Sequence, residues 1–260
     1  MEAIEASEVS HTEICTTADA LDGSVIFHTI YDVIGFVLYM HQQIPSTLQD
    51  MSIEFDTMHS EYNQLVSVLA ETELKASQRR YHISKMRGIK LGIRRLEKLM
   101  NALSNMKTAI QLIINEIPNI EKIILALGAS PRRPQHIYIL SFSHGTAGPS
   151  GGNDFTRSKA ADGLSRKAIR TLISKGAGSV TYPGSSKLFL LIKAPSSFNQ
   201  PQHFLPIRDF RYNKKIMPFR LLFKCRNQCQ EEVAPTSEDL LWFQCRHVIK
   251  GLAMNTVPEE

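Results

Sequence analysis

Four side chains near the C-terminus have the chemistry of zinc ligands. Cys225 and Cys229 lie close together, and Cys245 and His247 follow a short distance later. Thiolates and an imidazole are ligands that a structural zinc site uses. The spacing fits such a site poorly, because zinc knuckles usually place two residues between the paired cysteines and Cys225 ends a strand-like run. We therefore expect free cysteines, which often act as small buried hydrophobes, and no metal or cofactor.

A glycine-rich loop and two histidines are the other candidates for chemistry. The loop at 145–154 precedes an expected helix, where backbone amides can bind phosphate. It lacks the Gly-Lys-Ser/Thr of a P-loop, and Pro149 removes one amide donor. His136 and His144 flank an expected strand without a nucleophile or paired acid beside them, so we expect surface histidines. These residues indicate no active site, and we expect a protein that is not an enzyme.

The composition excludes several functional classes. With 43% hydrophobic and 21% charged residues the chain is able to bury a core, and its four cysteines are too sparse for a disulfide scaffold. No stretch approaches the roughly 20 apolar residues of a membrane span. The net charge of +5 is small, and the basic residues occur in dispersed pairs without a dense stripe. We expect an intracellular protein with no membrane partner and no direct nucleic-acid partner.

The ends of the chain differ from its interior. Residues 1–23 are acidic and without period, which predicts a flexible N-terminal tail, and residues 253–260 are expected to form a flexible C-terminal tail. Between them, apolar residues recur at three and four positions after Ser24. This spacing predicts a buried helix with Ser24 as its N-cap and Pro45 marking its end.

Two further helices are expected before the middle of the chain. An amphipathic helix is predicted within 51–74, and the basic segment 75–87 is interpreted as a mobile linker. A long helix is then predicted over 88–117, ended by Pro118, with a continuous apolar side that makes it the central core helix.

The second half of the chain changes to short runs rich in β-branched and aromatic residues. Residues 122–127 and 136–142 predict a hairpin. A helix over 154–175 follows, and its expected inner face consists of Leu164, Ala168, Leu172 and Ile173. Further strands are predicted at 179–182, 187–192 and 219–225. Helices and strands without a regular βαβ alternation favour the α+β class, with an antiparallel sheet packed against helices.

Two surface features of this half need an explanation. The only tryptophan, Trp242, lies in an apolar run near the end of the chain, where an undocked tail is normally polar. That run must therefore be held by something. On the helix at 154–175, Arg166 and Arg170 surround Ile169, which fits either a solvated basic face or a protein-binding face.

The order of these elements resembles a HORMA domain, and its motifs are similar to those of the comet family of HORMA-like proteins. The segment Leu38–Pro45, LYMHQQIP, is similar to the Leu-Tyr-x-Arg-x-x-Ile/Leu-Pro pattern that ends the first HORMA helix, with His41 in place of the Arg. Trp242–Gln244 and Lys250–Gly251 resemble the closing motifs of the comet family. The resemblance spans residues 24–252.

The resemblance implies one HORMA-like domain over 24–252. Residues 195–252 would form the "safety belt" and the internal segment that it encloses. In the comet family this segment is the protein's own C-terminal strand. The residues implied to be buried in it are Leu241, Trp242, Phe243 and Val248.

The resemblance also implies a function. Comet-type proteins are adaptors that bind the closed form of the checkpoint protein Mad-two and present it to a Pch-two class AAA+ ATPase, which silences the spindle checkpoint. HORMA proteins of the meiotic chromosome axis are a further expected client, and the implied location is the nucleus and cytoplasm, including kinetochores, spindle and meiotic chromosomes. The implied partner-binding residues are Tyr39, Met40, Gln43, Arg166, Ile169, Arg170 and Ile173. The implied ATPase-contact residues are Phe204, Pro206 and Ile207. The alternative is a zinc-containing or basic nucleic-acid-associated module.

Overall fold

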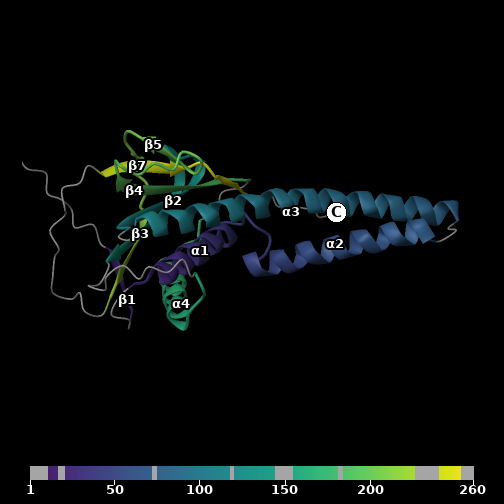
Figure 1. Ribbon diagram of the computed structural model, residues 1–260, viewed down its shortest axis with the longest axis horizontal. Helices are drawn as coiled ribbons and strands as arrows, with labels where there is room; N and C mark the ends of the chain where they lie inside the picture. Colours follow the sequence, from purple (N-terminus) through teal and green to yellow (C-terminus); the bar gives the residue numbers. More distant parts are fainter. Residues whose placement is uncertain are drawn as a thin grey trace, which may run out of the picture.

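The computed structural model describes residues 11–16, 21–71, 75–117, 120–143, 155–180, 184–225 and 240–252. These residues form helices and one mostly antiparallel sheet, which confirms the α+β class (Figure 1). The helices are α1 (Gly23–Met40), α2 (Leu48–Glu71), α3 (Ala76–Glu116) and α4 (Lys159–Ser174). The strands are β1 (Thr12–Cys15), β2 (Lys122–Ser130), β3 (Arg133–Ser143), β4 (Lys187–Pro195), β5 (Phe204–Ile207), β6 (Phe219–Lys224), β7 (Leu240–Cys245) and β8 (Ile249–Lys250).

The order of strands in the sheet is β1-β6-β3-β2-β4-β7-β5, with β8 pairing β4 beside β7. The pairs β1–β6 and β6–β3 are parallel, and the other pairs are antiparallel. The expected hairpin is therefore present as β2 and β3, and the expected strands at 187–192 and 219–225 are present as β4 and β6. The segment after β4 contributes strands to both halves of the sheet, because β5 lies at one end and β6 lies near the other.

The two faces of the sheet are covered differently. Successive side chains of a strand point to opposite faces, so each inner strand contributes to two cores. On one face Leu125, Leu140 and Leu190 pack in the main core with α1, α3 and α4. On the other face Ile124 and Leu191 form a smaller core, which Phe210 and half-buried side chains of the irregular segment before β6 cover. No helix belongs to this second core among the described residues.

Helix α1 is the centre of the main core. Ile30, Val33 and Ile34 are fully buried in it, as the three- and four-residue spacing predicts. The N-cap is Asp22, whose side chain accepts a hydrogen bond from the Val25 amide at 2.6 Å. The expectation of Ser24 as the cap is wrong by two residues. Among the described helices α1 alone has the length and apolar character of a membrane span, and here its apolar residues are buried within the domain.

Part of the expected N-terminal tail is ordered. Thr12–Cys15 forms β1, which pairs in parallel with β6, and Ile14 is buried in the main core. The prediction of a flexible tail over 1–23 is therefore wrong for these residues. Without β1, β6 would be an edge strand with unpaired backbone groups, which favour pairing with another extended segment. The remainder of that tail at 1–10 and 17–20, and the expected C-terminal tail at 253–260, lie outside the described residues.

Helices α2 and α3 form a long antiparallel hairpin that projects from the body of the domain (Figure 1). The segment 75–87 was expected to be a linker, but residues 76–87 are part of α3, a single helix of 41 residues whose N-cap is Lys75. It contains no proline and consists largely of good helix formers, and α2 supplies an apolar face for it to pack against. We call the part of α2 and α3 that extends beyond the body the arm.

Two other expectations need correction. The helix expected over 154–175 begins at Lys159, with the Ser158 hydroxyl accepting from the Ala161 amide, because this capping bond fixes the first turn. Residues 179–180 of the strand expected at 179–182 form a bend, and the remainder of it lies outside the described residues. The glycine-rich loop at 145–154, with His144, also lies outside them.

Candidate functional site: the α1–α4 face and the C-terminal segment

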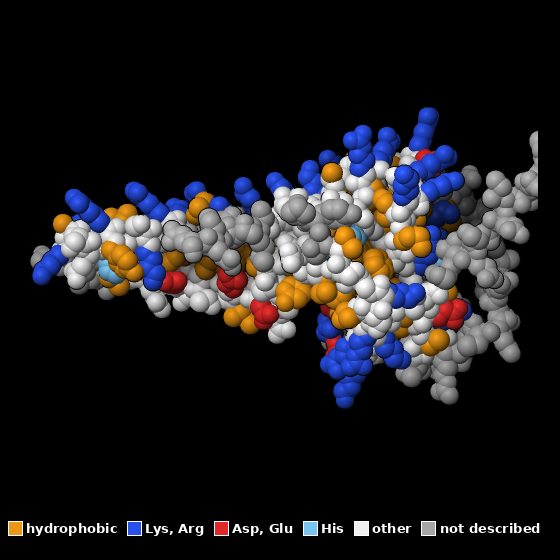
Figure 2. All heavy atoms as spheres, turned by 180° about the vertical axis from the view of Figure 1, so that it is seen from behind, with side chains coloured by type: hydrophobic (Ala, Val, Ile, Leu, Met, Phe, Trp, Pro, Cys, Tyr) orange, Lys and Arg blue, Asp and Glu red, His pale blue; other side chains and the backbone are white. Residues whose placement is uncertain are grey.

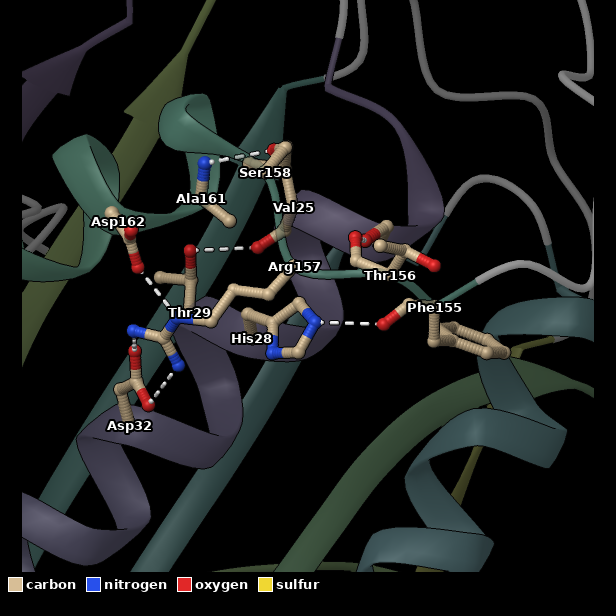
Figure 3. Close-up of polar contacts among 11 residues, drawn as sticks. Val25, His28, Thr29, Asp32, Phe155, Thr156, Arg157, Ser158, Ala161 and Asp162 are labelled. Atoms are coloured by element: carbon tan, nitrogen blue, oxygen red, sulfur yellow. Dashed lines mark hydrogen bonds and ion pairs between the residues drawn. The ribbon is translucent and has the colours of Figure 1, made fainter.

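Helices α1 and α4 lie side by side and run in the same direction. At their N-terminal ends, the Ser24 hydroxyl donates to the Thr156 carbonyl at 2.7 Å, and a hydrogen bond of 2.9 Å joins His28 Nε2 to the Phe155 carbonyl. The Phe155 ring packs edge-on against Phe27 at 5.0 Å. The segment before α4 is therefore fixed along the first two turns of α1 (Figure 3).

Arg157 is the main polar link between the two helices. Its guanidinium donates to both carboxylate oxygens of Asp32 at 3.1 and 2.8 Å and to Asp162 at 2.5 Å (Figure 3). These hydrogen bonds, chiefly those to Asp32, raise the pKa of Arg157, and the hydrogen bond that Asp162 accepts from Arg157 lowers the pKa of Asp162. Two parallel hydrogen bonds between one guanidinium and one carboxylate fix the relative orientation of the two groups as well as their separation. Arg157 therefore orients the first turn of α4 against the middle of α1.

The C-terminal ends of α1 and α4 meet at a glycine. Gly178 follows α4 with φ +84°, and a Cβ placed there would lie 2.9 Å from the Cβ and Cε of Met40. Only glycine adopts this conformation at low cost and permits this contact. Met40 is consequently half-buried beneath the turn after α4.

The outward side of this helix pair carries exposed apolar side chains. Tyr39 on α1 is 47% exposed and Ile173 on α4 is 54% exposed, so the expectation that Ile173 faces inward is wrong. Ile169 is half-buried one turn before Ile173. Arg166 and Arg170 are exposed beside it. We call the surface formed by Tyr39, Met40, Arg166, Ile169, Arg170 and Ile173 the docking face.

Gln43 is not part of this surface. It was expected among the partner-binding residues, but it is only 2% exposed. Its side chain accepts from the Ser186 amide at 2.6 Å and donates to the His41 carbonyl at 2.8 Å, while its own carbonyl accepts from the Leu252 amide at 2.8 Å. Gln43 therefore ties the end of α1 to β4 and to the C-terminal segment.

Gly251 completes this link. A Cβ at Gly251 would lie 2.1 Å from the Gln43 side-chain oxygen, a distance that no side chain tolerates. The glycine of the Lys250–Gly251 motif is thus required because the backbone passes directly over a buried glutamine. Two motifs far apart in the sequence form one contact.

His41, at the position of the expected arginine, is also buried. A hydrogen bond of 2.6 Å joins its Nε2 to the Tyr138 hydroxyl, and the His136 ring lies 4.0 Å from the His41 ring. Burial, with a smaller contribution from His136, lowers the pKa of His41 to about 4. His136 is half-buried with a lowered pKa, so the expectation of a surface histidine is wrong. The site accommodates a neutral imidazole.

We predict that acid destabilises the domain through His41. Because its pKa is lower in the folded state, the unfolded chain binds the proton first, and the contribution present above pH 6.5 is lost as the pH falls toward 4. Between pH 7 and pH 5 the free energy of unfolding should decrease by about 2 kcal/mol from this group. Urea unfolding at both pH values measures the change. His41→Gln, which retains a donor for Tyr138, should remove most of it, and an equal decrease in this variant would contradict the assignment.

The Trp242 segment forms an inner strand. β7 pairs with β4 on one side and with β5 on the other, and β8 continues along β4. Phe243 points into the main core, where its ring packs edge-on against Phe198 at 5.0 Å. Trp242 points to the other face and lies against Phe210 at 5.6 Å. Leu241 was expected to be buried but is 40% exposed, and Trp242 and Val248 are half-buried.

β5 covers the outer side of β7 and is itself an edge strand. Phe204, expected to contact an ATPase, is buried and packs on Phe198 in the main core, so it supports the strand from within. Pro206 is exposed and Ile207 is half-buried. Leu205, which the sequence did not single out, is also exposed. The accessible part of this segment is therefore its outer edge with Leu205 and Pro206.

Among the described residues, Cys225 and Cys245 lie too far apart to share a metal ion. Cys225 follows β6 and Cys245 ends β7, and three strands lie between them in the sheet, a separation of about 19 Å at 4.8 Å per strand. Burial raises the pKa of Cys245 to about 11, which disfavours the thiolate that zinc requires. His247 contacts His203 instead, with their ring nitrogens 2.8 Å apart. Cys229 lies outside the described residues.

Sequence reasoning missed Arg157, Asp32 and Gly178, which position α4. Arg157 immediately precedes the helix cap and is an isolated cation, so nothing in its local pattern distinguishes it from a solvated side chain. No model of a known protein family matches this chain, and no significant match is found among the curated proteins.

Proposed function

We propose that this chain is a HORMA-like, non-enzymatic adaptor of the comet type, which binds the closed form of a Mad-two-like HORMA protein and presents it to a Pch-two class AAA+ ATPase. The proposed outcome is silencing of the spindle checkpoint, with meiotic axis HORMA proteins as further clients. The observation that carries the proposal is the docking face, where Tyr39 and Ile173 leave apolar surface exposed on adjacent, rigidly linked helices.

The chemistry of the docking face supports a protein partner. Interfaces depend on a few aromatic and aliphatic anchors surrounded by a polar rim. Tyr39 and Ile173 are suitable anchors, and Arg166 and Arg170 provide a cationic rim. The face therefore suits a partner with an apolar patch and acidic residues around it. The Arg157 hydrogen bonds and the Gly178 contact hold α1 and α4 in place relative to each other. The two helices therefore lose little conformational entropy when a partner binds.

The arrangement of the C-terminal segment also supports the proposal. The chain passes from β4 to β5, then to β6 near the opposite end of the sheet, and returns as β7 between β4 and β5. A belt that encloses the chain's own strand is what the HORMA resemblance implies for a comet-type protein. Since β7 already occupies the edge of β4, the domain has no free edge there for an external peptide, and partner binding is assigned to the helices instead.

The edge of β5 is the proposed ATPase contact. Its outer backbone edge has no strand beside it among the described residues, and Leu205 and Pro206 are exposed on it. An extended segment of a partner is able to pair with such an edge as an additional strand. Pro206 has no backbone N–H, so it cannot donate a hydrogen bond to that segment. This surface lies at the sheet end opposite β1, away from the docking helices.

We predict that removing the two exposed anchors abolishes partner binding. In Tyr39→Ala with Ile173→Ala, affinity for closed Mad-two should fall by about 1,000-fold, because such anchors contribute about 2 kcal/mol each and 1.4 kcal/mol corresponds to tenfold in affinity. Size-exclusion co-migration and a titration with Mad-two locked in its closed form measure the loss, with open Mad-two as the specificity control. Both side chains are substantially exposed, so the fold should remain intact.

The matched control is Tyr81→Ala with Ile53→Ala. These residues are 65% and 60% exposed on the arm, and the control removes the same atoms from another surface. Affinity should change less than about twofold in the control. Equal affinities of the two double variants for closed Mad-two would contradict the assignment of the docking face as the binding surface. Absence of binding by the unmodified chain to both forms of Mad-two would remove the proposed partner.

A further inference from the structure

The positive charge of the arm is concentrated on one helix. Residues 76–98 of α3 contain eight Lys or Arg and one acidic residue, Glu97, whereas α2 contains five Asp or Glu and no Lys or Arg. Figure 2 shows Lys and Arg side chains spaced along one edge of the arm, with Asp and Glu along the opposite edge. The expectation of no dense stripe was based on the dispersal of these cations in the sequence. One continuous helix over Ala76–Glu116 places them on a common surface.

Pairing within the arm does not account for this charge. Among the described residues the structure has one ion pair between the two helices, Lys85 with Glu61 at 2.6 Å. The other seven cations of this stretch are exposed and form no ion pair in the described part of the chain. Because these side chains are exposed, their field extends into solvent.

Four of these cations share one face of α3. Arg80, Arg87 and Arg94 recur every seven residues, which places them on nearly one line about 10 Å apart at 1.5 Å per residue. Lys98 continues the line, and all four are exposed. We call these residues the basic stripe. Its length is about 27 Å, measured along 18 residues of helix.

The stripe ends at a hollow beside the body of the domain. This hollow has a volume of about 710 Å³ and lies between the base of α3 and the C-terminal segment. Lys98 and Arg95 line it from α3, and Lys250 lines it from β8. No acidic residue is among the described residues that line it. The cationic surface of the arm therefore continues onto the body.

We propose that the basic stripe, together with Arg95 and Lys250, binds the phosphate backbone of a nucleic-acid duplex. A rigid row of cations about 27 Å long matches a run of phosphates along a groove, and an α-helix fits the roughly 12 Å wide major groove of DNA. Contacts to phosphates alone carry no sequence information, so binding is independent of sequence. The residues of this surface lie on α3 and β8, whereas those of the docking face lie on α1 and α4.

The chemistry of the stripe favours a polyanion over the other acidic partners. A protein partner needs clustered apolar anchors, whereas the large exposed apolar residues along the stripe, Tyr81 and Leu91, lie about 15 Å apart along the helix. An anionic membrane surface needs an apolar helix face to insert, whereas the apolar face of α3 is turned toward α2 at Ile93 and Leu96.

The experiment measures binding of the full chain to a fluorescein-labelled 20-base-pair DNA of arbitrary sequence between 50 and 200 mM salt. Micromolar affinity that falls steeply with salt is expected. In Arg80→Gln with Arg87→Gln and Arg94→Gln, affinity at 100 mM salt should fall about tenfold or more. The slope of log affinity against log salt should become shallower by about 2 to 3, since each lost phosphate contact contributes about 0.9. Glutamine is a good helix former, so thermal unfolding should be unchanged.

The control variant, Arg132→Gln with Arg133→Gln and Arg208→Gln, removes three exposed arginines outside the stripe. It has the same net charge as the stripe variant, and its affinity for the duplex should change less than about threefold. Equal losses in both variants would show an effect of net charge and overturn the proposal. No duplex binding at 50 mM salt would also overturn it, as would stripe-dependent binding to polyglutamate or phosphatidylserine vesicles without binding to the duplex.

Discussion

Replacing Phe243 with alanine should lower the free energy of unfolding by about 3 to 5 kcal/mol, the range for deleting a buried phenylalanine. Phe243 is 4% exposed in β7, and its ring packs against Phe198, which in turn packs against Phe204 of β5 at 5.5 Å. The substitution removes the ring that β7 contributes to this cluster and leaves a cavity beside Phe198. Urea unfolding measures the loss, and hydrogen exchange of the β5 and β7 amides should show faster opening of this end of the sheet.

The control lies in the same strand. Leu241→Ala truncates a side chain that is 40% exposed, and it should cost less than about 1 kcal/mol because little apolar area is lost from the interior. Equal stability of the two variants would contradict this prediction. It would mean that β7 is stabilised by its backbone hydrogen bonds and not by the packing of its side chains.

Gln43→Ala should lower the free energy of unfolding by about 2 to 4 kcal/mol, because it leaves the Ser186 amide and the His41 carbonyl without their partner in a buried site. Hydrogen exchange should also accelerate at Leu252, whose amide donates to the Gln43 backbone. The adjacent Gln42→Ala is the control, since Gln42 is exposed and should cost less than about 0.5 kcal/mol.

This variant also separates two interpretations of the motif at the end of α1. If Gln43 contacted a partner directly, Gln43→Ala would weaken partner binding and leave the stability of the domain unchanged. A tie to the C-terminal segment requires the opposite, a large loss of stability. The buried position favours the tie, and it explains why Gln43 and Gly251, far apart in the chain, are both needed.

Local patterns in the sequence were sufficient for most helices and strands. The apolar spacing that buries Ile30 and Ile34 in α1 predicts that helix, and the β-branched runs predict β2, β3 and β4. They failed where local composition resembled a linker. The polar segment at the start of α3 has a weak apolar pattern, and it is helical because α2 packs beside it.

Positions within the candidate site were harder to predict. A motif shows which residues occur together, but not which of them face solvent, and this distinction separates exposed Tyr39 from buried Gln43. The burial of Phe204 and the exposure of Leu241 depend in the same way on which strand lies beside each of them.

By itself the sequence determined the α+β class and the need to hold an apolar C-terminal run, since periodicity and apolar content are properties of local segments. Only the tertiary structure decided how that run is held, how α4 is fixed to α1 by Arg157, and how dispersed arginines become one stripe on α3. The physical reason is that burial, strand neighbours and the common face of a long helix arise from contacts between segments that are distant in the chain.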